Sequence, residues 1–469
     1  MISKTLLKEL SGIVGKKYLM TTQKDMVEFA ADATKIAHMP DVVAFPENSE
    51  QISRILRLAT ENGFPVVPRG AGTGMSGGAV PVHGGVVLAM DRLNRILSVD
   101  RDNLIARAEP GVITADLQQA VEAQGLFYPP DPASLKVSTL GGNIAECAGG
   151  LRAVKYGVTR DYVLGLTIVL PTGEIIKTGV ETRKGVAGYD LVRLIAGSEG
   201  TLAIITAMTL RLVPKPETKR TMVAFFENVS LAVQTVSKII RNKIVPAILE
   251  FMDRLCIDCV REEMHLDLPE NSGAMLLIEV DGAPDLVAHQ ARIIEDLCGV
   301  ATVFRAAKTP ESAEALWETR RNVSPSLHKL SPHKINEDIV VPRSRLAELV
   351  SFLGTVSMEY GLPIPAFGHA GDGNIHVNIM VDKNNEQEYT NGIKAKHKLF
   401  EFVLSLGGTL SGEHGIGTTK SEFLPLEIDE TALSIMQRLK TLFDPNNILN
   451  PGKIFPDRDE KEKGLGTNT

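Results

Sequence analysis

The sequence predicts an α+β fold in two main parts, and three observations support this prediction. Residues 41–68 follow a strand, helix and strand pattern. Two stretches rich in glycine and other small residues, 69–78 and 129–157, interrupt the apolar runs around them. Strand and helix patterns then resume after the triplet Pro214-Lys215-Pro216, and such a triplet is typical of a domain boundary.

These patterns define the expected domain organisation. The strand-like runs at 164–176 and 197–214 close the first α+β domain, and the alternation at 274–299 and 344–356 builds the second. The polar end of the chain has too little apolar surface to fold. We therefore expect one domain at 1–216, a second at 217–425, a C-terminal segment at 426–456 that packs on the first domain, and a disordered tail at 457–469.

The composition is that of a globular protein without a polyanionic partner. The 469 residues are 43% hydrophobic, which can fill the cores of two or three domains. Fifty Lys and Arg residues against 57 Asp and Glu residues give a net charge of −7. A chain with this balance has no basic field to hold a polyanion, so nucleic acid is excluded as an expected partner.

The number and spacing of the cysteines and the length of the apolar runs indicate the cellular compartment that we expect for the protein. The four cysteines are too few and too irregularly spaced for a disulfide framework, which indicates a reducing, cytoplasmic location. Cys256 and Cys259 lie in a pattern with helical spacing and are expected to be buried in a helix. Residues 1–19 mix charges into their apolar pattern and predict a surface helix. No run approaches the ~20 apolar residues that span a bilayer, so any membrane contact is expected through a partner.

The first glycine cluster, RGAGTGMSGG at 69–78, contains a literal G-x-G-x-x-G. A dinucleotide-binding Rossmann motif requires a helix to begin at this loop. Here Pro81, Gly84 and Gly85 follow, and a strand-like run comes next. We therefore predict a loop between two strands whose successive N–H groups bind a phosphate; a glycine-rich bulge without a ligand is the alternative.

A second group of chemically active side chains lies near the end of the expected second domain. Glycines at 368, 371 and 373 exclude a helix, and 375–380 alternates as a strand that places His376 and Asn378 on one face. His369 lies in the loop that feeds this strand. Glu413 and His414 lie in a later glycine-flanked turn.

Two imidazoles and a carboxylate, from His369, His376 and Glu413, form a three-ligand set of the kind that holds a catalytic metal. Zinc is favoured, and iron and manganese remain possible. His414, next to Glu413, is the candidate general base because imidazole titrates in the working range. Asn378 is expected to hydrogen-bond a substrate.

The glycine-rich motifs carry a family resemblance. RGAGTGMSGG at 69–78, PPDPASLKVSTLGGNIAECAGG at 129–150 and SEGTLAIIT at 198–206 together resemble the FAD domain of vanillyl-alcohol oxidase type flavoproteins. Within that group, the chain is similar to the branch of glycolate-oxidase flavin subunits, D-lactate dehydrogenases and D-2-hydroxyglutarate dehydrogenases. The resemblance implies a two-part FAD-binding domain, an α+β substrate or cap domain with an antiparallel sheet, and a C-terminal helical segment that returns to the FAD domain.

The resemblance also implies the cofactor-binding residues. The first loop would wrap the FAD pyrophosphate, the second would line the flavin, and later residues would enclose the rest. FAD is expected to be noncovalent, because Ala71 and Thr73 stand where some relatives carry a linking histidine. The expected set is Arg69, Gly70, Ala71, Gly72, Thr73, Gly74, Ser76, Gly77, Pro132, Thr139, Gly142, Asn143, Ala145, Gly149, Glu199, Gly200, Ile205 and Asn450.

The activity implied by the resemblance is metal-assisted oxidation of a D-2-hydroxy acid, with D-lactate or glycolate leading. Relatives have metal ligands at the positions of His369, His376 and Glu413. Arg320 matches the arginine that binds the substrate carboxylate. Ser324 falls where some relatives carry a hydroxyl. Lys334 lies near an expected lysine, but its spacing departs by about two residues from the hydroxyglutarate enzymes, which favours a smaller substrate.

Several alternatives remain open at this stage. A D-2-hydroxyglutarate dehydrogenase, an FAD-containing electron-transfer subunit, and a metal hydrolase or oxygenase without flavin are the competing functions. The electron acceptor is expected to be an electron-transfer flavoprotein, an iron–sulfur subunit, a cytochrome or a quinone, and nothing in the sequence selects among them. A homodimer or membership of a hetero-complex is expected.

Overall fold

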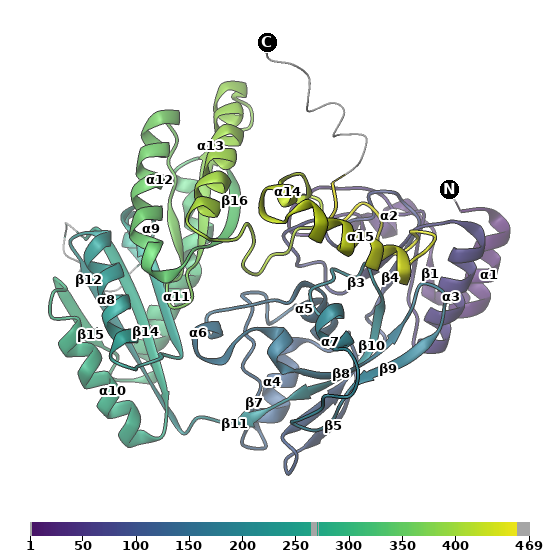
Figure 1. The fold of residues 1–469 in the computed structure, drawn as a ribbon, viewed down its shortest axis with the longest axis horizontal. Helices are drawn as coiled ribbons and strands as arrows, with labels where there is room; N and C mark the ends of the chain where they lie inside the picture. Colours follow the sequence, from purple (N-terminus) through teal and green to yellow (C-terminus); the bar gives the residue numbers. More distant parts are fainter. Residues whose placement is uncertain (1, 264–269, 271, 457–469) are drawn as a thin grey trace. The chain divides into compact units, whose positions relative to one another are not determined.

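The computed structural model describes residues 2–263, 270 and 272–456, which form two compact units (Figure 1). The first unit comprises 1–149, 158–215 and 413–469, and the second comprises 150–157 and 216–412. The division by contacts begins the main stretch of the second unit at residue 216 rather than 217, and it differs from the expected boundaries at two further places. It assigns 150–157 to the second unit, and it returns the chain to the first unit at residue 413 rather than 426. The expected disordered tail at 457–469 lies outside the described residues.

The first unit begins with a small mixed sheet and two helices packed on it (Figure 1). The parallel strands β2, β4 and β3 confirm the strand, helix and strand pattern predicted for 41–68. Helix α3 is capped by the Asn48 side chain and ends at Gly63 in the left-handed conformation, as its sequence indicates. The sheet order is β1 (Leu19–Met20), β2 (Val42–Ala44), β4 (Val86–Ala89) and β3 (Val66–Arg69), with α1 (Lys4–Val14) and α3 (Ser49–Asn62).

An antiparallel sheet of five strands completes the core of the first unit. Its central strand, β10, is formed by the apolar run that was expected to close the first domain. The order is β5 (Ile96–Asp100), β6 (Ile105–Ala108), β10 (Ile204–Arg211), β8 (Val163–Val169) and β9 (Ile175–Gly179). The other elements of this unit include α4 (Thr114–Glu122), α7 (Leu191–Ile195), and the pair β7 (Leu126–Phe127) and β11 (Val213–Pro214).

The stretch 129–157 is not irregular throughout, although its small residues did not lead us to expect helices. It contains the short helices α5 (Leu140–Glu146) and α6 (Ala153–Tyr156). The Thr139 side chain caps α5 by accepting a hydrogen bond from the Gly142 amide. A Cβ atom on Gly141 would lie 2.5 Å from Cβ of Pro110. Glycine here therefore serves close packing rather than a loop conformation.

The C-terminal helix α15 (Glu430–Phe443) leads into a segment tied to the first unit by a buried carboxylate. Asp444 accepts hydrogen bonds from the amides of Ile448 and Leu449 and pairs with Lys440. The Asn450 amide then donates to Val66 of β3. The local contacts of Asp444 thus shape the segment, and the bond from Asn450 to Val66 ties it to the sheet.

The second unit is a seven-stranded sheet in which every neighbouring pair is antiparallel. The antiparallel sheet expected for the second domain is therefore present. The order is β15 (Val303–Ala306), β12 (Thr218–Phe226), β14 (Ala274–Gly282), β13 (Ile248–Asp253), β17 (Ala366–His369), β18 (Asn374–Val381) and β16 (His333–Val340).

Helices cover this sheet in two groups (Figure 1). A row of four packs side by side in the order α10 (Pro284–Leu297), α8 (Val229–Arg241), α12 (Leu346–Tyr360) and α13 (Glu386–Ser405). A pair, α9 (Arg254–Val260) and α11 (Pro310–Ser326), packs together against β12, β13 and β14. Cys256 and Cys259 are buried in α9, as expected for structural cysteines. None of the helices in the described residues is long and apolar enough to span a membrane.

We predict that Asp444→Ala destabilises the protein by roughly 3–5 kcal/mol, because it leaves Lys440 buried without its counter-charge and two buried amides without an acceptor. Denaturant unfolding measures the change. Asp429→Ala is the control, since it removes only the N-cap of α15 and should cost about 1 kcal/mol. Equal losses for the two variants would contradict the assigned role of Asp444.

Candidate functional site

A cavity in the first unit is lined mainly by residues with small side chains. Its volume is about 1340 Å³, including space open to solvent. Fifteen of the residues expected to bind the cofactor line it: Arg69, Gly70, Ala71, Gly72, Thr73, Gly74, Pro132, Thr139, Gly142, Asn143, Ala145, Gly149, Glu199, Gly200 and Ile205. Ser76, Gly77 and Asn450 of the expected set are not among its lining residues. A cavity lined by glycine and alanine lets a large ligand approach the main chain closely.

The first glycine loop connects β3 to β4 without a helix, as predicted, so it is not a Rossmann motif. Gly72 has a φ of +68°, and a Cβ atom there would lie 2.1 Å from Nη2 of Arg69. The Arg69 guanidinium donates to main-chain carbonyls of Glu28, Ala31 and Ala79. Arg69 therefore braces the end of β3 against the 28–31 segment and, through Ala79, the end of the loop, and Gly72 leaves room for that brace.

Glu199 holds the segment that carries two of the expected active-site residues. Its carboxylate accepts hydrogen bonds from the amides of Ile416 and Gly417, at 2.8 and 2.7 Å. Its carbonyl oxygen accepts from Nδ2 of Asn450, which also donates to the carbonyl of Gly78. Asn450 thus joins the first glycine loop to Glu199, and Glu199 fixes the chain just after residues 413 and 414.

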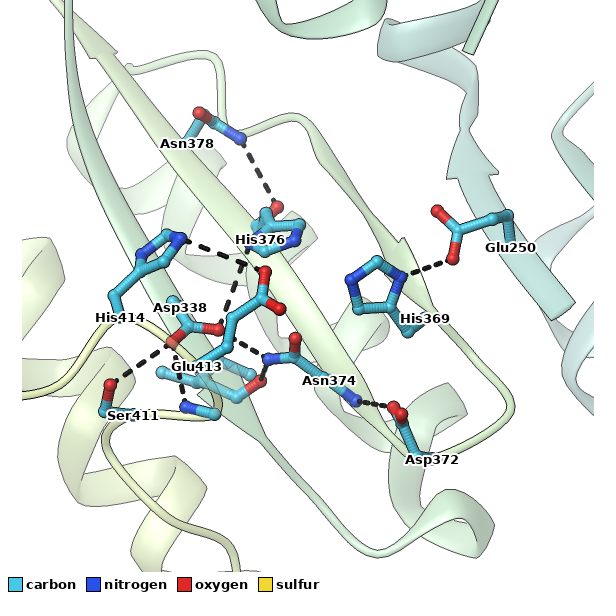
Figure 2. Close-up of polar contacts among 12 residues, drawn as sticks. Glu250, Asp338, His369, Asp372, Asn374, His376, Asn378, Ser411, Glu413 and His414 are labelled. Carbon is cyan, nitrogen blue, oxygen red and sulfur yellow. Dashed lines mark hydrogen bonds and ion pairs between the residues drawn. The ribbon is translucent and has the colours of Figure 1, made fainter. Parts of the chain in front are cut away.

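Glu413 and His414 both line this cavity. Their side chains are 17% and 16% exposed, and Nε2 of His414 lies 4.0 Å from Oε1 of Glu413 (Figure 2). A Cβ atom on Gly149 would lie 2.7 Å from Oε2 of Glu413. The absence of a side chain at 149 therefore makes room for the Glu413 carboxylate at the cavity wall.

Sequence reasoning missed Glu146, a half-buried carboxyl that also lines the cavity. Burial raises its pKa well above the usual range, and the nearby Glu199 and Asp32 carboxylates raise it further. The signal was present in the sequence, because Glu146 is the one carboxylic acid in the motif NIAECAGG.

In the second unit, strand register places a row of polar side chains on one face of the sheet. Glu250 of β13 lies opposite His369 of β17, and Phe367 of β17 lies opposite His376 of β18. Asp338 of β16 lies opposite the same His376. Because side chains alternate along each strand, all of these project from the same face. His369 is the last residue of β17 rather than a loop residue, which corrects that detail of the prediction.

The two histidines lie close together on this face, and each has an acidic neighbour (Figure 2). Their ring centroids are 5.3 Å apart and the rings are nearly perpendicular. Nδ1 of His369 is hydrogen-bonded to Oε1 of Glu250. Nδ1 of His376 lies 3.9 Å from Oδ1 of Asp338. Sequence reasoning found both histidines but missed both carboxylates, each of which sits within an apolar or mixed strand.

Asp338 also organises the end of the second unit (Figure 2). Its Oδ1 accepts a hydrogen bond from Nδ2 of Asn374 at 2.6 Å. Its Oδ2 accepts from the Ser411 hydroxyl at 3.2 Å and from the Gly412 amide at 2.9 Å. Asp338 therefore fixes the main chain at Gly412, the last residue before Glu413.

Helix α11 lies on the same face of the sheet and meets its polar side chains turn by turn. Trp317 donates from Nε1 to Glu279 at 3.2 Å, and Arg320 pairs with Glu250. Ser324, one turn further on, accepts from Nζ of Lys334 at 2.7 Å. Arg320 and Ser324, four residues apart, thus face the sheet from the same side of α11. Lys334 of β16 meets them there, so the three residues selected from the sequence lie on one face of the sheet.

Arg320 is 9% exposed and makes a strong ion pair. Both Nε and Nη2 lie 2.6 Å from Oε2 of Glu250, and the guanidinium lies over the Phe367 ring. Burial alone would raise the pKa of Glu250, but the charges and hydrogen bonds of His369 and Arg320 lower it to about 2. Glu250 is therefore ionised and accepts hydrogen bonds from both partners.

Asn378 lies on β18 two residues from His376 and is fully buried. Its Nδ2 donates to the carbonyl of His376 at 3.3 Å. Its Oδ1 is buried and has no hydrogen-bond partner among the described residues. A buried amide oxygen in this state is a site for a ligand donor, which fits the expected contact with a substrate.

Comparison with known families shows what this architecture is. Residues 40–179 match the FAD binding domain, and residues 215–454 match the C-terminal domain of FAD linked oxidases. The chain belongs to the FAD-linked oxidases. It is therefore an FAD-dependent oxidoreductase, and the cofactor expected from the sequence is confirmed. The small-residue cavity of the first unit fits such a cofactor.

Curated relatives of this FAD-linked oxidase extend over nearly its whole length. The chain is 46% identical over 458 residues to the glycolate oxidase subunit GlcD of Bacillus subtilis (strain 168), covering 97% of each chain. It is 36% identical over 427 residues to a D-lactate dehydrogenase of Anaerostipes hadrus, covering 88% of this chain and 89% of that one. The predicted family branch is confirmed.

Solved structures confirm the expected fold of this FAD-linked oxidase. A p-cresol methylhydroxylase with substrate bound superposes with a TM-score of 0.80 at 17% identity, covering 97% of this chain and 96% of that one. An alkyldihydroxyacetonephosphate synthase superposes with a TM-score of 0.76 at 21% identity, covering 96% and 86%. At these identities the likeness concerns the fold.

We predict that Gly72→Ala lowers the flavin content of the purified protein at least several-fold, because the new methyl group would collide with Arg69 and displace the loop. The flavin-to-protein absorbance ratio measures this. Gly63→Ala is a matched control, since Gly63 has nearly the same φ, +69°, with no atom within 4 Å of its Cβ position. Full flavin content in Gly72→Ala would show that the loop does not need this brace.

Proposed function

We propose that this FAD-linked oxidase carries out the metal-assisted oxidation of a D-2-hydroxy acid to the 2-oxo acid, with glycolate and D-lactate as the leading substrates. The relatives named above are a glycolate oxidase subunit and a D-lactate dehydrogenase. The observation that carries the proposal is the donor set itself. His369 and His376 are both buried in the second unit with their ring centroids 5.3 Å apart, and we propose Glu413 as the third ligand.

The chemistry of these residues suits a divalent cation. Two imidazoles and one carboxylate leave coordination positions open for a substrate, and zinc is favoured, with iron and manganese possible. Because ionised Glu250 can only accept a hydrogen bond, it directs the Nδ1 proton of His369 toward itself and leaves Nε2 as the ligand atom. A bound metal would lower the pKa of a coordinated hydroxyl.

The remaining residues have roles that follow from their chemistry. Arg320 would bind the substrate carboxylate through the part of its guanidinium that does not face Glu250. His414 would accept the hydroxyl proton, and Asn378 would accept a hydrogen bond through its buried Oδ1. FAD supplies the hydride acceptor. Ser324 and Lys334, bonded to each other, would border the substrate region.

Electrons would then leave the flavin for a protein or quinone acceptor. The relative from Bacillus subtilis is named as a subunit, which supports a hetero-complex in which another chain accepts the electrons. An iron–sulfur subunit, a cytochrome, an electron-transfer flavoprotein and a quinone are all compatible with this role. A reducing cytoplasmic location remains our proposal from the cysteine pattern.

The function is tested by anaerobic reduction of the flavin with a panel of D-2-hydroxy acids. We predict that glycolate or D-lactate bleaches the flavin and that His414→Ala keeps its FAD but is reduced at least ~100-fold more slowly, because the proton acceptor is lost. His289→Ala, an exposed histidine of α10, should behave as wild type. Reduction of His414→Ala at the wild-type rate would remove the base assignment.

We further predict that Glu413→Gln lowers metal retention roughly 10-fold or more, because a neutral amide is a much weaker ligand than a carboxylate. Elemental analysis after dialysis against a weak chelator measures the bound metal. Glu422 is exposed and lies in the same final stretch of the first unit as Glu413, so Glu422→Gln is the control. Wild-type metal content in Glu413→Gln would exclude Glu413 as a ligand.

A further inference from the structure

Glu250 is one of two fully buried carboxylates, with Asp338, that lie beside the histidines of the proposed site, and the proposed function uses only its contact with His369. Its exposed fraction is 0%, and it lies on β13, directly opposite His369. One carboxylate oxygen is bonded to His369 and the other to Arg320. A carboxylate removed from water at this depth is expensive unless it is fully paired.

We propose that Glu250 is a positioning residue that couples the metal-binding histidine to the substrate-binding arginine, an inference that rests on the proposed function. Through Oε1 it would fix the tautomer and orientation of His369. Through Oε2 it would fix the guanidinium plane of Arg320. A single carboxylate would therefore set the relative geometry of the two groups that hold the metal and the substrate carboxylate.

The contacts of each carboxylate oxygen of Glu250 support this role. Oε1 of Glu250 is bonded to Nδ1 of His369, so Nε2 is the ring nitrogen that does not face the carboxylate and can face a cation. Such carboxylate–histidine pairs orient metal ligands in many sites. On the other side, Nε and Nη2 of Arg320 converge on Oε2 at 2.6 Å, and the ring of Phe367 supports the guanidinium from its face.

Comparison of Glu250 with another buried carboxylate of the same sheet, Glu279, distinguishes a positioning role from a purely structural ion pair. Glu279 of β14 is also buried, with an exposed fraction of 3%. Its carboxylate accepts hydrogen bonds from Thr221 and Trp317 and pairs with Lys219. Glu279 thus satisfies the same burial requirement without contact to His369 or Arg320, and Glu279→Gln is a matched control.

Glu250→Gln is the informative substitution because it keeps the size of the side chain and removes one acceptor. A glutamine has one acceptor oxygen, whereas Glu250 uses two. If the amide oxygen faces Arg320, the NH₂ group faces Nδ1 of His369 and forces the proton onto Nε2. If the oxygen faces His369, the NH₂ group opposes the guanidinium. Either arrangement disturbs one of the two partners.

We predict that Glu250→Gln lowers the affinity for Zn²⁺ roughly 10- to 100-fold, raises KM for glycolate or D-lactate more than it lowers kcat, or does both. A chelator competition gives the affinity, and steady-state kinetics with added Zn²⁺ give the KM and kcat. Glu279→Gln should keep both properties. Flavin content reports the first unit independently and should be unchanged in both variants. A Glu250→Gln protein with wild-type Zn²⁺ affinity and wild-type KM would overturn the proposal.

A second measurement keeps this test separate from that of the proposed function. Histidine ¹⁵N NMR on the metal-free protein reports the His369 tautomer, assigned by comparison with His369→Gln. We expect Nδ1 to be protonated in the wild type and in Glu279→Gln, and this signature to be lost or weakened in Glu250→Gln. A wild-type protein without Zn²⁺ affinity would end the proposed metal centre, whereas an unchanged tautomer in Glu250→Gln would refute the positioning role itself.

Discussion

The antiparallel register of β13, β17, β18 and β16 is the constraint on which the second unit's chemistry depends. It brings Glu250, His369, His376 and Asp338 to one face of the sheet, each histidine opposite or beside a carboxylate. Because the side-chain period is two, a slip of one residue would turn the affected strand's polar groups into the apolar layer on the other face. The apolar alternate residues, such as Ile375 and Val377, oppose that slip because they are fully buried.

The first unit, in contrast, must hold its main chain close around a large ligand. Its glycine-rich loops carry few side chains of their own, so their shape comes from neighbours: Arg69 bonds to three carbonyls and Asn450 bridges two more. Glu199 adopts a φ of +51°, uncommon for a residue with a side chain, while accepting two amides. Such a conformation persists where the surrounding bonds determine it.

Sequence patterns predicted the fold class, the family and most strands because these depend on local periodicity and on motif order. The helices α5 and α6 escaped prediction, since α5 depends on a cap from Thr139 and on Gly141 packing against Pro110. Glu250 and Asp338 also escaped, because each shares its strand with another acid, Asp253 or Glu337, and its histidine partner lies 119 or 38 positions away in the chain. Only the register shows that each faces a histidine. Arg69 was selected correctly as a residue of the loop, but its side chain turns to the main chain behind it.

The segment from Gly412 to Gly417 shows how the chain makes one short stretch serve both units. Asp338 binds the amide of Gly412 within the second unit, and Glu199 binds the amides of Ile416 and Gly417 within the first. Both carboxylates are buried, so these bonds are shielded from competing water. Within the first unit, the Glu199 bonds fix the main chain two residues after His414. In the function proposed above, Glu413 is a metal ligand and His414 is a proton acceptor, and both roles lose effectiveness when the side chain is displaced by about 1 Å. Anchoring of the backbone by a buried carboxylate is the means by which a glycine-rich turn limits such a displacement.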